Sequence, residues 1–120
     1  MRAVGAALLL SCLGPAGATP ALAHAIVIDS TPASGGVVTG PDLTIELRFN
    51  SRIDHRRSRL ILYLADGSAR PLSQAPDVAP DVVAARAVGL APGAYRLRWQ
   101  VLAVDGHITR GDIPFKVVAP

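Results

Sequence analysis

Two side chains near the C-terminal end of the chain, Asp105 and His107, are of types that bind metal ions. They lie two residues apart, so on an extended strand they project to the same side. A third candidate is His24, because cleavage after Ala23 makes it the N-terminal residue, with an α-amine beside its imidazole. One carboxylate oxygen and three nitrogens form a square-planar or tetragonal set, which suits Cu(II). These residues therefore predict one copper site.

Residues 1–23 have the layout of a secretory signal peptide. Arg2 precedes a short apolar run, residues 3–10, and the segment ends on the A-x-A pattern Ala21-Leu22-Ala23. The run is shorter than the ~20 residues that a membrane-spanning helix needs, and no later segment approaches that length. We therefore expect export to the periplasm, no transmembrane segment after cleavage, and one domain over residues 24–120.

The only cysteine, Cys12, lies inside this first segment. The exported chain is therefore expected to contain no disulfide and no thiolate ligand. An alternative stays open, because Leu9-Leu10-Ser11-Cys12 loosely resembles a bacterial lipoprotein processing site, and lipidation there would leave His24 inside the chain. The apolar stretch before Cys12 is very short for that pathway, so we favour cleavage after Ala23.

The formal net charge of +3 comes from arginine, because Lys116 is the only lysine. Arg52, Arg56, Arg57 and Arg59 cluster in one region. We expect a solvated face there, with an anionic partner site as the alternative. Aromatic residues make up 4% of the chain, too few for a base-stacking platform, so nucleic acid is not an expected partner.

Short apolar runs separated by Gly, Pro, Asp and Ser predict an all-β fold, and no window shows helical periodicity. Residues 43–50 and 95–103 alternate apolar and polar side chains, as half-buried strands do. About seven short strands with frequent turns indicate an immunoglobulin-like Greek-key β-sandwich. The expected strands include residues 24–29, 43–50, 58–64, 82–88, 95–103 and 113–117, with a loop over 74–81.

The inward row of the strand from Tyr95 to Ala103 continues by twos to Asp105 and His107. A carboxylate and an imidazole on a core-facing side are costly unless they are paired. We therefore expect both at the rim of the sandwich, where the strand ends and Gly106 allows a bend. A bound cation at this rim satisfies both side chains.

Six motifs span the chain in order: His24-Ala25, Ser30–Gly35, Ile45–Phe49, Gly93–Trp99, Asp105-Gly106-His107 and Gly111–Val117. Together they resemble the CopC family of periplasmic copper-resistance proteins. The resemblance implies a β-sandwich that carries copper. It also implies that Cu(II) is held by His24, Asp105 and His107.

Two features found in some members of that family are missing here. One is a glutamate near the end of the second strand that can join the Cu(II) site, where Asn50 or Ser51 stands in this chain. The other is a methionine-rich stretch for Cu(I), whereas the only methionine here is Met1. We therefore expect no Cu(I) site built from soft ligands.

The remaining candidates have ordinary expected roles. His55, in the basic run Asp54-His55-Arg56-Arg57, is expected in an exposed loop at the surface. Trp99 is expected in the core. No serine stands in a nucleophile motif, so the sequence does not predict an enzyme of that kind.

The leading interpretation is a non-enzymatic periplasmic Cu(II) carrier or buffer in copper homeostasis and resistance, with an inner-membrane copper transport protein as its partner. One alternative is a copper-dependent oxidative enzyme, since an N-terminal histidine and a second histidine also hold copper in polysaccharide-cleaving enzymes. A small, aromatic-poor chain with Asp105 near the metal argues against it. The other alternative is a metal-free immunoglobulin-like interaction domain, whose stability should not respond to copper.

Overall fold

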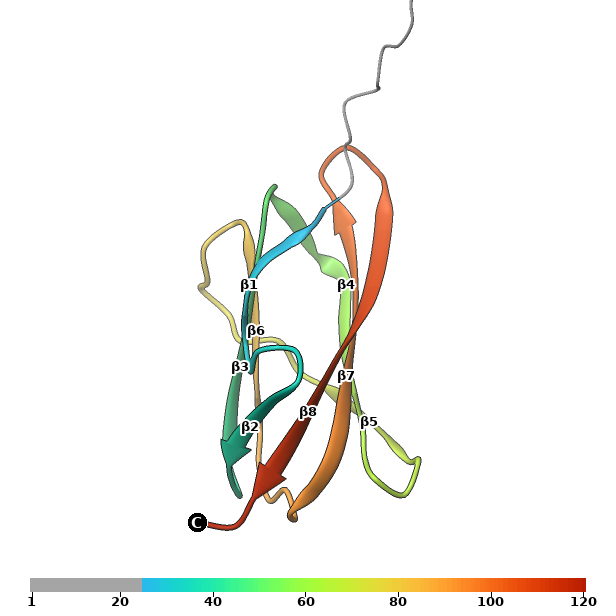
Figure 1. The fold of residues 1–120 in the computed structure, drawn as a ribbon. Coiled ribbons are helices and arrows are strands. Elements are labelled where there is room, and N and C mark those ends of the chain that lie inside the picture. The colour runs from blue at the N-terminus through green and yellow to red at the C-terminus, as the bar shows by residue number, and fades with distance from the viewer. Residues whose placement is uncertain (1–24) are drawn as a thin grey trace, which may run out of the picture.

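The computed structural model describes residues 25–120, which form a sandwich of two β-sheets (Figure 1). The predicted signal peptide and His24 lie outside these residues. One sheet has three strands in the order β1-β3-β6, and the other has five in the order β2-β8-β7-β4-β5. The strands are β1 (Val27–Thr31), β2 (Gly36–Thr39), β3 (Leu43–Phe49), β4 (Ile53–Tyr63), β5 (Ala69–Leu72), β6 (Val82–Ala87), β7 (Gly93–Ala103) and β8 (Ile108–Val118).

The paired strands of both sheets run antiparallel except β2, which runs parallel to β8. β1 and β2 follow each other in the chain but belong to different sheets, so the chain crosses the sandwich between them. The longest pairing joins β7 to β8, in register from Gly93 opposite Val117 to Leu102 opposite Ile108. This long hairpin carries the Asp105–His107 segment at its tip, at one end of the sandwich (Figure 1).

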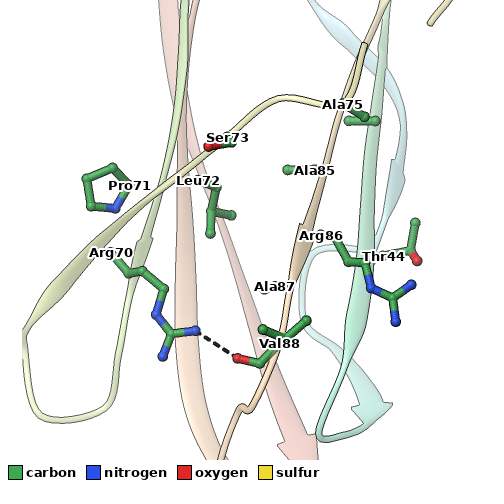
Figure 2. A pocket seen from close by; sticks show the side chains of 11 residues that line it. Thr44, Arg70, Pro71, Leu72, Ser73, Ala75, Ala85, Arg86, Ala87 and Val88 are labelled. Atoms are coloured by element: carbon green, nitrogen blue, oxygen red, sulfur yellow. Dashed lines mark hydrogen bonds between the residues drawn. The ribbon is translucent and has the colours of Figure 1, made fainter. Parts of the chain in front are cut away.

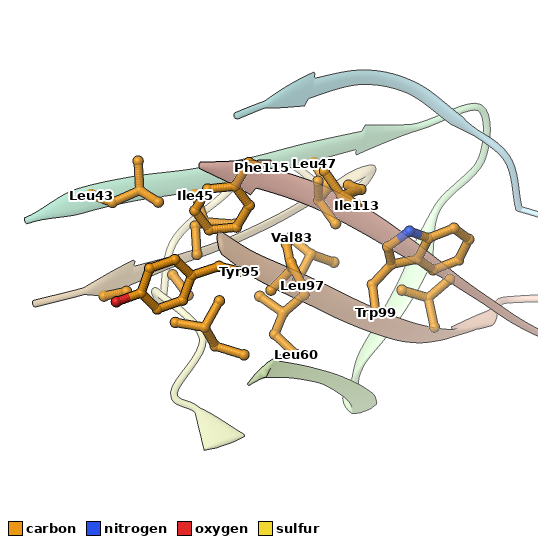
Figure 3. Packing of buried hydrophobic residues seen from close by; sticks show 14 of the residues in the cluster. Leu43, Ile45, Leu47, Leu60, Val83, Tyr95, Leu97, Trp99, Ile113 and Phe115 are labelled. Atoms are coloured by element: carbon orange, nitrogen blue, oxygen red, sulfur yellow. The ribbon is translucent and has the colours of Figure 1, made fainter. Parts of the chain in front are cut away.

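The core forms where the alternating strands turn their apolar sides toward each other (Figure 3). In β3 and β7 every second side chain is buried, as the period of two in the sequence predicts. Leu47 and Leu97 are fully buried between the sheets. The ring of Trp99 meets that of Phe49 edge to face, with ring centroids 5.2 Å apart, which confirms the expected core position of Trp99.

The predicted all-β sandwich of immunoglobulin type is confirmed, with one strand more than the seven expected. The additional short strands β2 and β5 were not predicted. Strand β8 begins at Ile108 rather than near Ile113, because its first half exposes apolar and polar side chains alike and so lacks alternation. Strand β4 begins five residues before the predicted start at Ser58, and an irregularity in its pairing lies between Asp54 and Arg59.

Gly111 gives a direct test of this packing. A Cβ on Gly111 would lie 2.5 Å from Cζ2 of Trp99, a residue that is 7% exposed and whose ring packs against Phe49. Gly111→Ala is therefore expected to lower the free energy of unfolding by about 1–3 kcal/mol, measured by urea denaturation. A smaller side chain in Trp99→Leu makes room for the methyl group, so the double variant should lose less than the two single losses added together. Simple additivity would show that Gly111 and Trp99 are not in steric conflict.

Candidate metal centre

The Asp105–His107 segment is a tight turn between β7 and β8. The N–H of Gly106 and the carbonyl of Ala103 form a hydrogen bond of 2.9 Å, and the N–H of Ala103 donates to the carbonyl of His107 at 2.9 Å. Gly106 has a φ of 97°, which a residue without a Cβ adopts easily. The glycine therefore allows the chain to reverse direction between the two candidate ligands, as its position in the motif predicted.

Asp105 and His107 contact each other in two ways. Oδ1 of Asp105 accepts a hydrogen bond of 3.1 Å from the backbone N–H of His107, and Oδ2 lies 3.1 Å from Nδ1 of the His107 ring. The backbone N–H of His107, and then its ring, lower the pKa of the Asp105 carboxyl below its ordinary value. The carboxylate is therefore ionised throughout the pH range in which a histidine is neutral and able to bind a metal.

The premise that these residues share one side of an extended strand is wrong. Strand β7 ends at Ala103 and β8 begins at Ile108, so the pair lies in the turn. The turn nevertheless brings the two side chains together, because the carboxylate reaches over Gly106 to the next residue's amide. The expected rim position is confirmed, since the side chains of Asp105 and His107 are 35% and 56% exposed.

The start of the described chain is fixed at the same end of the sandwich as this turn (Figure 1). Ala25 is completely buried. The N–H of Ile26 donates to Oδ1 of Asn50 at 2.8 Å, and its carbonyl accepts from the N–H of Asn50 at 3.0 Å. Two residues further on, the carbonyl of Arg52 accepts a hydrogen bond of 3.3 Å from the N–H of Val104. The β3–β4 connection thus contacts both the residue two places after His24 and the residue before Asp105.

Asn50 holds the start of the described chain in place, a role that was not predicted from the sequence. The sequence showed only that Asn50 or Ser51 stands where some CopC proteins carry a glutamate. In the structure the Asn50 side chain holds the backbone of Ile26, so it fixes where the chain begins its first strand. The hydroxyl of Ser51 is buried and has no hydrogen-bond partner among the described residues. No local signal in the sequence distinguishes an asparagine that binds backbone from one that faces solvent.

The expected surface position of His55 is wrong. His55 lies within β4 rather than in a loop, and it is half-buried. Its Nε2 forms a hydrogen bond with the carbonyl of Val82, and its own carbonyl accepts one of 3.0 Å from the side chain of Gln74. His55 therefore has a structural role, because it links β4 to the start of β6 and to the loop before it.

Two further observations concern the rest of residues 25–120. Within this range no three histidine, cysteine, aspartate or glutamate side chains gather in a way that could hold a metal ion. Nor does this part of the chain contain a helix long and apolar enough to cross a membrane. The cluster of Arg52, Arg56, Arg57 and Arg59 is exposed, as expected, and Arg57 lies 4.0 Å from Asp54.

A groove of about 610 Å³ lies between β5 and β6 (Figure 2). Its lining is largely apolar, with the side chains of Arg70 and Arg86 at opposite sides. Nη1 of Arg70 donates a hydrogen bond of 3.0 Å to the carbonyl of Val88. None of the lining residues is a histidine, cysteine or carboxylate, so the groove offers no metal-binding side chain.

The fold and the turn define a β-sandwich of immunoglobulin type with a candidate metal centre at one end. Residues 27–118 match the family model described as the CopC domain, so the chain belongs to the CopC family. The predicted resemblance is confirmed. No curated protein matches the chain.

Two solved structures have the same fold over most of this chain. CopC from Methylosinus trichosporium OB3b is 24% identical, with a TM-score of 0.71 over 80% of this chain and 95% of that chain. PcoC from Escherichia coli, described as a methionine-rich copper resistance protein, is also 24% identical. Its TM-score is 0.64, over 79% of this chain and 99% of PcoC. At these identities the likeness establishes the shared sandwich.

Proposed function

We propose that this protein is a periplasmic Cu(II)-binding protein that carries or buffers copper and catalyses no reaction. Its membership of the CopC family and its likeness to copper-resistance proteins support a copper-related role. The single observation that carries the proposal is the exposed turn in which Asp105 and His107 contact each other. This turn lies at the end of the sandwich where the first strand begins (Figure 1).

The proposed ligands are the α-amine and imidazole of His24, the imidazole of His107 and the carboxylate of Asp105. The α-amine and the imidazole of His24 bind the same metal ion and so close a chelate ring. Nitrogen donors also favour Cu(II) over the earlier divalent metals. A free amine has a pKa of about 7.7–8.0, and both it and the imidazoles must be deprotonated to bind. Copper affinity should therefore fall as the pH drops below neutral, while Asp105 stays ionised.

Asp105 has a second role in this proposal, because Oδ2 already lies 3.1 Å from Nδ1 of His107. In the chain without copper this contact holds the ring of His107 close to the carboxylate, so the two proposed donors lie side by side before the metal binds. Loss of Asp105 should then weaken copper binding in two ways, by removing a donor and by releasing the ring of His107.

The oxidation state follows from the donors that the sequence offers. Cys12 and Met1 are the only sulfur-containing residues, and both precede His24. PcoC, by contrast, is described as methionine-rich. Thioether and thiolate ligands select Cu(I), whereas imidazole, amine and carboxylate suit Cu(II). The proposed cargo is therefore Cu(II) at one site, and an inner-membrane copper transport protein is the proposed recipient.

Thermal unfolding tests the proposal directly. Copper that binds only the native chain stabilises it, by about 2.7 kcal/mol when free copper is 100 times Kd. For a domain of this size, the melting temperature of the protein that begins at His24 should rise by on the order of 10 °C. Mg(II), a hard ion that prefers oxygen ligands, serves as the control and should leave it unchanged. An unchanged melting temperature with stoichiometric Cu(II) would indicate a metal-free interaction domain instead.

A further inference from the structure

The positive charge of the domain is concentrated on the outer face of the five-stranded sheet. Side chains at alternate positions of β4, β7 and β8 point outward, because their neighbours in sequence fill the core. We call this surface the cationic face. It carries five cations and one carboxylate, a formal charge of +4 against +3 for the whole chain. The cations are Arg59, Arg96, Arg98, Arg110 and Lys116, and the carboxylate is Asp112.

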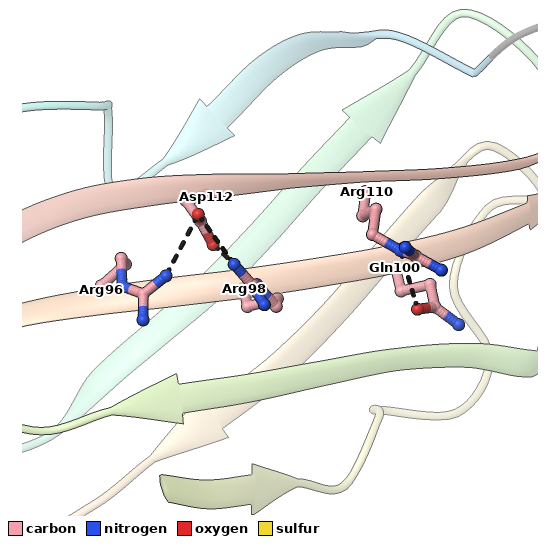
Figure 4. Close-up of polar contacts among 5 residues, drawn as sticks. All are labelled: Arg96, Arg98, Gln100, Arg110 and Asp112. Carbon is pink, nitrogen blue, oxygen red and sulfur yellow. Dashed lines mark hydrogen bonds and ion pairs between the residues drawn. The ribbon is translucent and has the colours of Figure 1, made fainter. Parts of the chain in front are cut away.

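Three of these arginines form hydrogen bonds with side chains on the neighbouring strand (Figure 4). Arg98 reaches Asp112 through Nε at 3.0 Å and Nη2 at 3.2 Å, and Nη1 of Arg96 reaches the same carboxylate at 3.1 Å. Nε of Arg110 donates to Oε1 of Gln100 at 3.2 Å. Their guanidinium groups therefore lie in fixed positions across β7 and β8, even though they are on the surface.

An aromatic ring supports the same array. The guanidinium carbon of Arg96 lies 4.4 Å from the centre of the Tyr63 ring, and that of Arg98 lies 5.8 Å from it. Tyr63 belongs to β4 and is paired directly opposite Arg96. Stacking and ion pairing already restrict these side chains in the free protein. They therefore lose less conformational entropy when a partner binds.

The array is not neutralised within the domain. Asp112 serves both Arg96 and Arg98, and the side chains of these arginines remain 42% exposed. The outward residue of β4 nearest to Gln100 is Arg59, which adds a further positive charge, and Lys116 adds one on β8. Like charges on one sheet face repel each other, so an anionic partner would relieve a repulsion that the isolated domain retains.

We propose that the cationic face is a docking surface for an acidic surface of a partner protein. Four of its five cations are arginines, whose planar forks match carboxylates in pairs. Arginine and tyrosine are also enriched in protein interfaces and among their energetic hot spots. A lipid surface is favoured instead by aromatic or aliphatic side chains that protrude among the cations. Here the ring of Tyr63 is covered by the guanidinium of Arg96, and the exposed aliphatic side chains of Ile108 and Val118 lie at the two ends of β8.

The cationic face shares the β7–β8 hairpin with the Asp105–His107 turn, so a docked partner would sit beside the proposed metal centre (Figure 1). The proposal goes beyond copper binding and does not require it. Docking is a property of the outer sheet face, and it is expected with or without metal.

A labelled peptide of ten glutamates is the probe, titrated by fluorescence anisotropy at low salt, with a decaglutamine peptide as the reference. The test variant carries Arg59→Gln, Arg110→Gln and Lys116→Gln, which spare the pairs made by Asp112. The control variant carries Arg48→Gln, Arg52→Gln and Arg56→Gln, which remove equal charge from exposed positions elsewhere. The test variant should bind about tenfold more weakly than the unmodified protein, and the control within about twofold of it.

Chemical-shift mapping on the unmodified protein makes the result independent of how the variants fold. Shifts caused by the glutamate peptide should concentrate on β4, β7 and β8 along the cationic face. Equal weakening in both variants, shifts centred elsewhere, or no binding would each overturn the proposal. So would tighter binding to vesicles that contain phosphatidylglycerol than to the peptide, since the face would then recognise lipid rather than protein.

Discussion

A protein with one extra residue before His24 is expected to bind Cu(II) about 100-fold more weakly than the chain that begins at His24. The added residue turns the α-amine into a peptide nitrogen, which removes one donor and opens the chelate ring. Structural zinc sites of four donors gain roughly 10–16 kcal/mol, or about 3 kcal/mol per donor, and a similar loss per donor here corresponds to about 100-fold. Isothermal titration of the two proteins measures the difference.

The matched control adds the same residue after Pro120, at the end of the chain that lies opposite the Asp105–His107 turn (Figure 1). This control should bind copper as tightly as the unmodified protein. Equal affinity in all three proteins would mean that the amine is not a ligand, even if copper still binds to the histidines.

The replacement His107→Ala should also reduce the affinity for Cu(II) by about 100-fold, because it removes one nitrogen donor. The exposed position of His107 means that the free energy of unfolding without copper should change little. His55→Ala is the matched control, since His55 is half-buried and bonded to the carbonyl of Val82. It should lower the free energy of unfolding by about 1 kcal/mol and leave copper affinity unchanged.

The two histidines thus separate binding from folding. Copper titration and urea denaturation of both variants provide the comparison. Loss of copper affinity in the His55 variant, with none in the His107 variant, would contradict a metal site at the Asp105–His107 turn.

The sandwich could be predicted from sequence because its central strands alternate. β3 and β7 carry apolar side chains at every second position, and those side chains fill the core. The short strands β2 and β5 have four residues each, and their burial alternates only between half-buried and exposed. A signal of that length cannot be told from a loop, since these strands form through pairing with β8 and β4 rather than through a pattern of their own.

The position of Asp105 and His107 at the rim was predicted from the sequence, but the geometry of their turn was not. The inward row of β7 runs toward Asp105, and the cost of burying a carboxylate places the pair at the strand end. Whether the pair continues a strand or closes a turn depends on the hydrogen bonds of Ala103 with Gly106 and His107. The bond between Ala103 and His107 forms only when the chain folds back toward β8, so the local sequence does not reveal it.

The role of His55 was missed for a related reason. Four arginines and an aspartate lie within four residues of it and indicate solvent, yet the ring of His55 forms a hydrogen bond with the carbonyl of Val82 at the start of β6. Charged residues in a sequence are themselves expected at the surface. In a strand they do not predict the position of the side chain between them, because adjacent side chains point to opposite faces.

The electron paramagnetic resonance spectrum of the Cu(II)-loaded protein that begins at His24 tests the central claim most directly. Nitrogen nuclei bound to copper split its spectrum, so the number of nitrogen donors can be counted. We expect three nitrogens and one oxygen in a tetragonal site, with one nitrogen lost in the His107→Ala protein. A spectrum with a single nitrogen donor, or one that His107→Ala leaves unchanged, would contradict a copper site built from His24, Asp105 and His107.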